Sequence, residues 1–386
     1  MRICLVSSHF YPAIFYGGPI SATWDLSKKL AEKGIEIYVS TTNANGRERL
    51  KNTDTKNHDK LVKNIYVRYY HEQIINFFSL SFLLNIHSDI KKSDVVYVQY
   101  LFHYTVVLSL FLAWVLKKKV IICPRGSFSS FTLENNKIYF KKLWLQILIK
   151  PFSKKVIWQA SSYLEKEDIL KSLINARVEI ISDGVNFNEF QDQEKMSLIP
   201  LVEKYTDTKF SEVSEVIFSM GRLHKIKGFN ILINSFDLYL KDNKHAKLII
   251  AGGDDGEREN LIRQITKMEL EESVFLIGLI DFKQKKELLS SCSFFALASE
   301  FESFGIVITE SLSCGTPVVV SDKTAWRDLN INNCGIFAKN QKQEFCDAFH
   351  EIKKENFTSE DCKNYVKENF DFEVVSQKFL NLITKK

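Results

Sequence analysis

Residues 299–320 have the sequence Ser-Glu-Phe-Glu-Ser-Phe-Gly-Ile-Val-Ile-Thr-Glu-Ser-Leu-Ser-Cys-Gly-Thr-Pro-Val-Val-Val, and they decide the fold class of this chain. An apolar strand at 294–298 precedes an acidic turn, a helix is expected from about Phe304 to Gly315, and a second apolar strand follows at 317–320. In a parallel sheet this is a β-α-β unit, and ligands bind outside the carboxyl ends of such strands. The pattern therefore places a ligand site at this turn.

Two carboxylates of this segment are candidate ligand contacts. Glu302 lies in the expected crevice loop beside the free N–H groups of the helix, and Glu310 lies about two turns along that helix. Such a pair can accept hydrogen bonds from the hydroxyl groups of two linked rings, with a phosphate near the helix N-terminus. A lone helix carboxylate is more often an ordinary solvated residue, so the surrounding sequence carries the prediction.

The whole segment resembles the signature of the retaining glycosyltransferases of family four. The likeness consists of two Glu separated by seven residues, Phe-Gly after the first and Cys-Gly-Thr-Pro-Val-Val after the second. It implies nucleotide-sugar donors and a GT-B fold, with two facing Rossmann-like domains and the donor cleft between them. It also implies that Glu310 binds the donor ribose, while Glu302 and the amides of Phe304, Gly305 and Ile306 face the transferred sugar.

Length and strand–helix rhythm predict an α/β protein of two doubly wound domains. A chain of 386 residues exceeds what one core usually supports, and two consecutive β-α-β runs of similar size follow one another. We expect an N-terminal Rossmann-like acceptor domain at 1–190 and a C-terminal nucleotide-sugar-binding domain at 191–366. The resemblance covers nearly the whole chain, and it adds a C-terminal helix at 367–386 that crosses back to the first domain.

Composition favours a cytoplasmic protein without a metal or other cofactor. The seven cysteines show no C-x-x-C spacing, which indicates reduced thiols. The N-terminal strand is too short and polar for a signal peptide. Residues 1–190 hold 26 Lys and Arg against 16 Asp and Glu, while the remainder holds 26 against 31. This asymmetry predicts that the first half meets an anionic surface or substrate.

Two segments of the basic half raise the question of a membrane. Val95–Leu116 has no charged residue and precedes three lysines, which meets the length rule for a span. Its many polar side chains instead favour a strand at 95–99, a buried helix at 105–116 and a strand at 120–123. Residues 135–155 combine aromatic and aliphatic side chains with the lysines Lys137, Lys141, Lys142, Lys150, Lys154 and Lys155. They fit either a helix on an anionic lipid surface or a core-packed helix with solvated lysines.

Two loops are candidates for phosphate binding. Gly17-Gly18 is not a G-x-G-x-x-G fingerprint, so NAD binding is not expected. Two glycines before a helix let backbone N–H groups approach a phosphate, although a plain loop fits as well. The resemblance places the pair against the donor phosphates. It also matches Gly221-Arg222-Leu223 and Lys227-Gly228 to a family element that clamps the diphosphate.

Arg222 and Lys227 would work as fixed cations that stabilise the leaving diphosphate without a metal. Asp254-Asp255 is the one pair of the Mg²⁺-holding type, and it fits better as the acidic turn before a helix. Arg125 stands where several family members carry a His. A permanently charged Arg cannot be a general base, but it can bind an anionic acceptor. His103 is the candidate cleft histidine for catalysis and acceptor binding, with a satisfied loop histidine as the alternative.

These observations predict a retaining, metal-independent glycosyltransferase of hexosyltransferase type. It would move a sugar from a nucleoside-diphosphate sugar to a glycan or lipid-linked acceptor, in surface polysaccharide biosynthesis, with an anionic membrane surface as a further partner. In the resembling family, retention is usually explained by front-face attack, with the leaving phosphate helping to deprotonate the acceptor. The alternatives are a GT-B-type nucleotide-sugar epimerase or phosphorylase and a non-enzymatic basic membrane-binding protein. Nucleic acid is not an expected partner, because a basic binding module would leave the Glu302–Glu310 segment unexplained.

Overall fold

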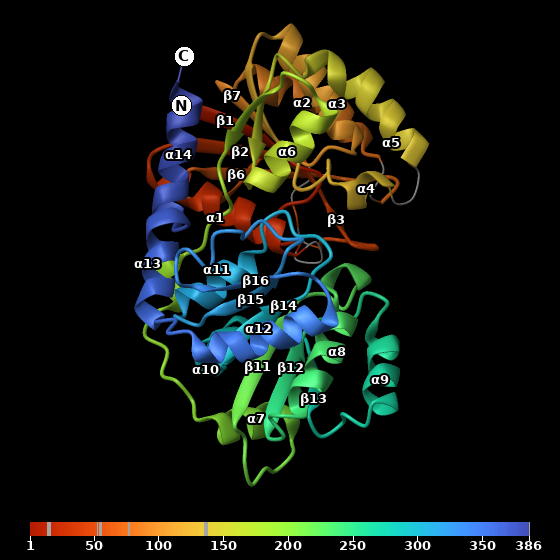
Figure 1. Ribbon diagram of the computed structural model, residues 1–386. Helices are drawn as coiled ribbons and strands as arrows, with labels where there is room; N and C mark the ends of the chain where they lie inside the picture. Colours follow the sequence, from red (N-terminus) through yellow and green to blue (C-terminus); the bar gives the residue numbers. More distant parts are fainter. Residues whose placement is uncertain (14–16, 52, 54–55, 76–77, 135–137, 386) are drawn as a thin grey trace. The chain divides into compact units, whose positions relative to one another are not determined.

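The computed structural model describes residues 1–13, 17–51, 53, 56–75, 78–134 and 138–385 (Figure 1). The chain forms two compact units. Unit 1 comprises Met1–Gly184 and Phe372–Lys386, and unit 2 comprises Val185–Asp371. The expected divisions at residues 190 and 366 lie a few residues from these limits.

Unit 1 is built on an eight-stranded sheet in the order β10-β9-β8-β7-β1-β2-β6-β5. Its strands pair in parallel except for the edge strand β5, which is antiparallel to β6. The strands are β1 (Arg2–Val6), β2 (Glu36–Thr42), β5 (Asp59–Val62), β6 (Ile65–Tyr70), β7 (Val95–Gln99), β8 (Lys119–Cys123), β9 (Ile157–Ala160) and β10 (Arg177–Ile180), with a separate hairpin of β3 (Ala44–Asn45) and β4 (Glu48–Arg49).

Helices cover both faces of this sheet, so its central strands are apolar on both sides. One face packs against α1 and α14, the other against α2, α3, α6 and the turn η2. Lys29 and Lys33 of α1 form ion pairs with Glu373 at the start of α14, which ties the C-terminal helix to unit 1. The helices are α1 (Gly18–Glu32), α2 (Leu80–Lys91), α3 (Tyr104–Val115), α4 (Ser130–Glu134), α5 (Ile138–Trp144), α6 (Tyr163–Ser172) and α14 (Phe372–Thr384).

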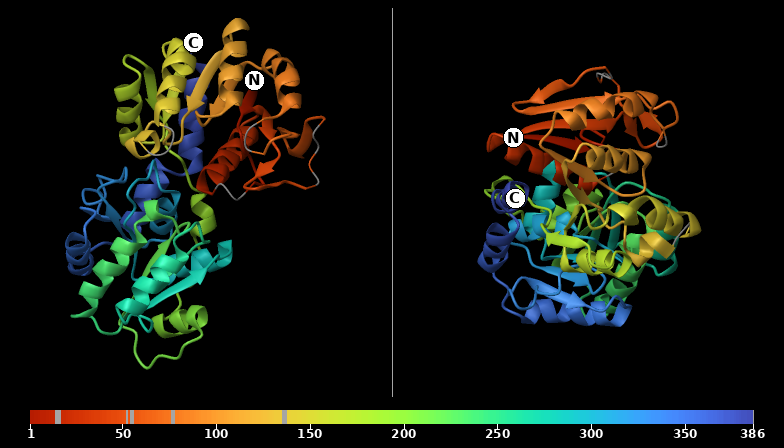
Figure 2. Two further views of the ribbon diagram at one scale, coloured as in Figure 1. Left: turned by 90° about the vertical axis from the view of Figure 1, so that its right-hand side faces the viewer. Right: turned by 90° about the horizontal axis from the view of Figure 1, so that it is seen from above.

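Unit 2 has a six-stranded, wholly parallel sheet in the order β13-β12-β11-β14-β15-β16. Helices again lie on both faces (Figure 2). The strands are β11 (Glu215–Met220), β12 (Ala246–Ala251), β13 (Val274–Gly278), β14 (Phe294–Leu297), β15 (Val318–Ser321) and β16 (Gly335–Ala338). The helices are α7 (Leu198–Thr206), α8 (Phe229–Leu240), α9 (Arg258–Lys267), α10 (Phe282–Ser291), α11 (Ile306–Ser313), α12 (Lys342–Lys354) and α13 (Ser359–Asn369).

Both sheets therefore reverse their winding direction once. In unit 2 the chain proceeds outward from β11 to β13 and then returns to the other side of β11 with β14. Unit 1 does the same from β1 through β2 and β6, and returns with β7. In doubly wound sheets the ligand crevice lies at this switch point, outside the carboxyl ends of the two central strands. The fold thus predicts one ligand site in each unit, at the pair of loops that follows the two central strands.

The apolar segment Val95–Leu116 is not a single span. It divides into β7 and α3, and no described helix is long and apolar enough to cross a bilayer. The expectation of a buried helix is also partly wrong, because α3 leaves Phe111, Trp114 and Val115 largely exposed. The basic segment that follows is α5, a π-helical turn η2 (Leu145–Ile149) and a 3-10 turn η3 (Lys150–Phe152). Lys137 lies outside the described residues.

Candidate functional site

The switch point of unit 2 is formed by the loops that follow β11 and β14. The first loop contains a 3-10 turn, η5 (Lys225–Lys227), and ends at Gly228, which has φ 63°. A Cβ at Gly228 would lie 1.9 Å from the carbonyl oxygen of Ala298, so only glycine permits this approach. The amide of Glu300 donates to the carbonyl of Ile226 at 2.8 Å. These contacts hold the turn against the end of β14.

This close approach brings Lys227 and Glu302 together. Their side chains form an ion pair, and the Ser299 hydroxyl donates to the same Glu302 oxygen at 3.3 Å. Both charged side chains are mostly buried. The stem of Lys227 lies against Gly221, where an added Cβ would meet its Cε at 3.2 Å. Lys227 and Glu302, which were predicted to contact different parts of the donor, are therefore in direct contact with each other.

The helix α11 begins beside this pair. Gly305 occupies the N-cap with φ 83°, so the first amides of α11 have no side-chain cap from that residue. Phe304 is a core residue whose ring packs against Trp326, and the Trp326 indole donates to its carbonyl. The contribution of Phe304 to a ligand would therefore come from its backbone, while Ile306 opens the helix. Such an end favours an anion.

Glu310 pairs with a lysine that the sequence analysis did not single out. The Nζ atom of Lys285 on α10 donates to Glu310 Oε1 at 2.5 Å, and both side chains are mostly buried. Lys285 Nζ also lies 5.2 Å from the ring centroid of Phe282 and 5.7 Å from that of Phe190. These aromatic faces help to hold the cation. One oxygen of Glu310 is thus occupied, and its orientation is fixed.

Arg222 is placed differently from Lys227. Its guanidinium pairs with Asp255 at 2.5 Å, and its side chain is 55% exposed. Asp254 accepts hydrogen bonds from the amides of Gly256 and Arg258, and these bonds lower the pKa of its carboxyl group. Asp254 thus caps α9, as expected for the acidic turn. The structure therefore brings Lys227 and Glu302 together and leaves Arg222 on the outer side of the same loop.

The switch point of unit 1 contains the remaining predicted residues. Gly17 is the N-cap of α1 with φ 74°, and Gly18 is the first residue of that helix. An added Cβ at Gly17 would meet no atom of the described residues within 4 Å. The pair thus stands at a helix start that follows the central strand β1, in agreement with a phosphate-binding position but equally with a plain loop.

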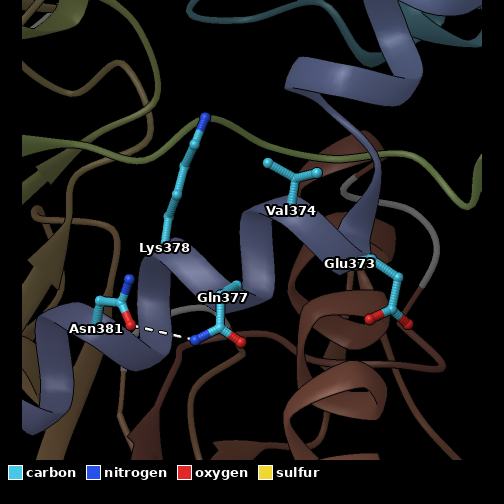
Figure 3. Close-up of a pocket in the computed structure, with 5 residues that line it drawn as sticks. All are labelled: Glu373, Val374, Gln377, Lys378 and Asn381. Atoms are coloured by element: carbon cyan, nitrogen blue, oxygen red, sulfur yellow. Dashed lines mark hydrogen bonds between the residues drawn. The ribbon is translucent and has the colours of Figure 1, made fainter.

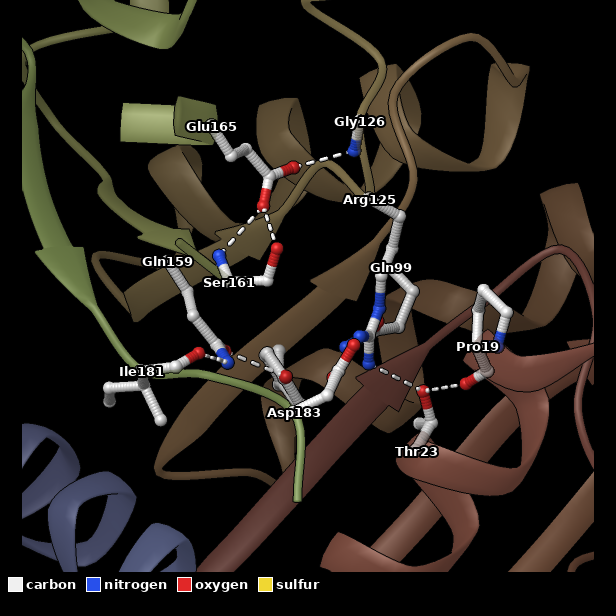
Figure 4. Close-up of polar contacts among 11 residues, drawn as sticks. Pro19, Thr23, Gln99, Arg125, Gly126, Gln159, Ser161, Glu165, Ile181 and Asp183 are labelled. Atoms are coloured by element: carbon white, nitrogen blue, oxygen red, sulfur yellow. Dashed lines mark hydrogen bonds and ion pairs between the residues drawn. The ribbon is translucent and has the colours of Figure 1, made fainter. Parts of the chain in front are cut away.

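Arg125 has a buried position that its predicted role did not anticipate. Its side chain is only 4% exposed and forms an ion pair with Asp183. It also donates from Nε to Gln99 at 2.9 Å and from a terminal nitrogen to Thr23 at 3.0 Å (Figure 4). These contacts join the end of β7 and the loops after β8 and β10 to α1. Acceptor binding by Arg125 stays a prediction, and the burial of its side chain favours a structural role.

His103 is the N-cap of α3, at the end of the short loop that follows β7. Burial lowers its pKa to about 4, so the imidazole is neutral near pH 7. Its Nδ1 atom is 2.8 Å from the Thr105 hydroxyl, whereas Nε2 is buried and has no hydrogen-bond partner among the described residues. In the tautomer with the ring proton on Nδ1, which donates to Thr105, Nε2 is the nitrogen that can accept a proton.

His9 is a second histidine at this place, and the sequence analysis missed it. It follows β1 as His103 follows β7, and its ring lies 6.2 Å from that of Tyr100. Burial, followed by the charge of His103, lowers its pKa to about 3. The signal was available, because both histidines come within a few residues of a central strand end.

One surface depression, of about 420 Å³, is a shallow hollow along α14 lined by Glu373, Val374, Gln377, Lys378 and Asn381 (Figure 3). It contains none of the predicted site residues. No group of three or more His, Cys, Asp or Glu that could hold a metal occurs in the described parts of the chain.

Comparison with known proteins addresses the switch point of unit 2. Residues 203–369 match the family model of the group 1 glycosyl transferases. An uncharacterized glycosyltransferase of Methanocaldococcus jannaschii is 29% identical over 221 residues, which are 57% of this chain and 50% of that protein. The N-acetylgalactosamine-N,N'-diacetylbacillosaminyl-diphospho-undecaprenol 4-alpha-N-acetylgalactosaminyltransferase of Campylobacter jejuni is 38% identical over 114 residues, which are 29% of this chain and 30% of that protein. The chain spans half or less of the length of these curated relatives.

Similarity to solved structures extends over the whole chain. The Anabaena protein HepE, crystallised with UDP, superposes with a TM-score of 0.76 at 18% identity and covers 100% of both chains. The fold is therefore that of the GT-B glycosyltransferases, as predicted. At this identity the likeness establishes the fold alone, and the chemistry depends on the residues of this chain.

Proposed function

We propose that the protein is a retaining glycosyltransferase that uses a nucleoside-diphosphate sugar without a catalytic metal. The observation that carries the proposal is the pairing of both signature carboxylates with lysines at the switch point of unit 2, Glu302 with Lys227 and Glu310 with Lys285. The Anabaena protein, which has the same fold, was crystallised with UDP, and this complex supports a nucleotide donor.

Each residue has a role that its chemistry can supply. Lys227, the first amides of α11 and a reoriented Arg222 would stabilise the charge that grows on the leaving diphosphate. Glu310 would accept the ribose hydroxyl groups, and Glu302 a hydroxyl of the transferred sugar. The leaving phosphate, or neutral His103, would take the acceptor proton as the new glycosidic bond forms.

We assign the acceptor to the glycan or lipid-linked class used in surface polysaccharide assembly at the cytoplasmic side of a membrane. The net positive charge of residues 1–190 supports an anionic acceptor or surface. The name of the Campylobacter relative, which contains a sugar linked to diphospho-undecaprenol, supports the same class.

The test is transfer and donor hydrolysis by the full chain with a panel of UDP-, GDP- and ADP-sugars, in the presence of EDTA. We expect one donor to be consumed and the α-configured donor sugar to give an α-configured product by NMR. The Glu302→Gln and Glu310→Gln variants should lose this activity. A strict Mg²⁺ requirement would refute the cation clamp, and a β-configured product would refute retention. Epimerised donor without transfer would support the epimerase alternative.

A further inference from the structure

Two neighbouring elements of unit 1 expose an unusual number of large apolar side chains. Each is between 48% and 87% exposed. Within each element they recur at intervals of three or four residues, which places them on one helix face. They are Phe111, Trp114 and Val115 at the end of α3, and Tyr139, Phe140, Leu143 and Ile147 on α5 and η2.

The two elements adjoin one another through specific contacts. The ring of Trp114 lies 6.4 Å from that of Phe152 in η3, and Lys155 Nζ lies 4.5 Å from the Trp114 centroid. Trp144, at the end of α5, donates from its indole nitrogen to the carbonyl of Leu101 at 3.2 Å, just before α3. The inward side of η2, with Leu145 and Ile149, joins the unit 1 core. The elements that carry the exposed faces are therefore packed firmly against each other and against the core of unit 1.

The charge of this region is almost entirely positive. Between Asp94 and Glu165 the sequence contains a single acidic residue, Glu134. Exposed lysines flank the apolar side chains: Lys117, Lys142, Lys150, Lys154 and Lys155. Lys141 differs from them, because its Nζ donates to the Thr132 carbonyl at 2.6 Å and lies over the ring of Phe102.

We propose that these seven apolar side chains and five lysines, the α3–α5 surface, insert shallowly into an anionic lipid bilayer. Aromatic side chains favour the headgroup level, and lysines extend from there to the lipid phosphates. Apolar burial and attraction to anionic lipids then act together, which gives reversible attachment. The α3–α5 surface thus contains α3 in addition to the basic segment 135–155. Its lysines are the outward ones, and Lys141 is not among them.

Charge distinguishes a bilayer from the other occupants of such a face. A second copy of the chain that docked face to face would bring two sets of five lysines together, and like charges repel across an interface. A protein partner would need an acidic rim around an apolar centre. An anionic bilayer supplies both features in one continuous surface, with no requirement for shape complementarity.

Co-sedimentation of the full chain with vesicles tests this proposal. Vesicles of phosphatidylethanolamine with phosphatidylglycerol should bind the protein, pure phosphatidylcholine vesicles much less, and rising salt should release it. Leu143→Ser with Ile147→Ser, and separately Lys142→Glu with Lys154→Glu, should each weaken binding by about tenfold. The matched controls are Ile331→Ser and Lys354→Glu, exposed residues of unit 2 that should bind as the wild type does.

The outcomes separate this inference from the proposed function. Donor hydrolysis without lipid should be unchanged in all four variants. Wild-type protein that binds vesicles but does not hydrolyse any donor would refute the proposed transferase activity and leave the lipid surface intact. Binding that ignores both pairs of substitutions would overturn the lipid surface. The lipid surface would also be overturned if the protein did not bind vesicles and instead formed a dimer, seen by light scattering, that the Leu143 and Ile147 substitutions convert to monomers. Capture by an acidic protein in place of vesicles would overturn it as well.

Discussion

The two sheets share the order of their central parallel strands but differ in the chemistry of their switch points. In unit 2 three carboxylate–cation pairs lie near the strand ends: Lys227–Glu302 and Arg222–Asp255 on the loops, and Lys285–Glu310 between α10 and α11. In unit 1 the corresponding place has two neutral histidines and a buried Arg125–Asp183 pair. Topology therefore fixes where a site can form, and the loop side chains decide what it can bind.

The difference follows from burial. Cations of unit 2 that stand on loops can exchange a carboxylate partner for a diphosphate, since the geometry around them is held by backbone contacts such as Glu300 to Ile226. The guanidinium of Arg125 has three side-chain partners and almost no exposure, so it fixes loops instead. We expect substitutions to affect function in unit 2 and stability in unit 1.

The largest expected effect is on the stability of unit 1. Arg125→Met should lower the free energy of unfolding by about 3–5 kcal/mol, because it leaves Asp183 buried without its cation. Urea denaturation followed by tryptophan fluorescence measures this, with Arg177→Met on the exposed edge strand β10 as the control. Unchanged stability combined with lost transfer to acceptor would restore Arg125 as an acceptor contact.

The next effect is on turnover in unit 2. Lys227→Ala should reduce kcat by at least about a hundredfold, as expected when a cation that stabilises the leaving group is removed. Lys225→Ala is the matched control, since Lys225 is an exposed lysine of the same 3-10 turn. If the two variants had equal activity, the charge would act at long range and not through the contact position of Lys227.

Lys285 should act on donor affinity more than on chemistry. Lys285→Met frees Glu310 from its fixed orientation, and we expect the donor KM to rise by about tenfold to a hundredfold with kcat little changed. Lys285→Arg should restore most of the affinity. The exposed Lys283 on the same helix provides the control Lys283→Met. A loss confined to kcat would contradict a positioning role.

The sequence predicted the elements of this fold better than the environments of its side chains. The expected helix from Phe304 to Gly315 is α11, Ile306–Ser313, between β14 and β15. Local apolar runs and glycines specify such elements. The partner of Glu310 lies on α10, and only the packed fold shows which lysine of that helix turns inward.

Burial was harder to predict for the same reason. Arg125 follows a strand, as a binding residue would, but contacts with Gln99 of β7, Thr23 of α1 and Asp183 enclose it. The apolar helix α3 was expected to be buried, although one of its faces is exposed. Hydropathy records the composition of a helix and does not reveal whether another element covers each face.

The neutral histidines of unit 1 predict a pH effect on stability. The folded state keeps His103 neutral down to about pH 4 and His9 to about pH 3, whereas the unfolded chain binds protons near the ordinary value of 6.5. Stability is therefore present above pH 6.5 and lost as pH falls, by about 2 kcal/mol per histidine at pH 5. His103→Gln should reduce the pH slope in urea denaturation, and His87→Gln on exposed α2 should not. Equal slopes would refute the buried, neutral assignment.

The smallest effect concerns Arg222, the exposed cation of unit 2. Its pair with Asp255 is open to solvent, and such pairs contribute at most about 1 kcal/mol. Asp255→Asn removes the competing carboxylate, so Arg222 can reach a diphosphate at lower cost, and the donor KM should fall by about two- to fivefold. Glu259→Gln, an exposed carboxylate in the first turn of α9, controls for the general change of charge. A higher KM in Asp255→Asn alone would mean that Asp255 orients Arg222 toward the donor. The pairs of unit 2 would then be positioning contacts, and the contrast with Arg125 and Asp183 would be one of exposure only.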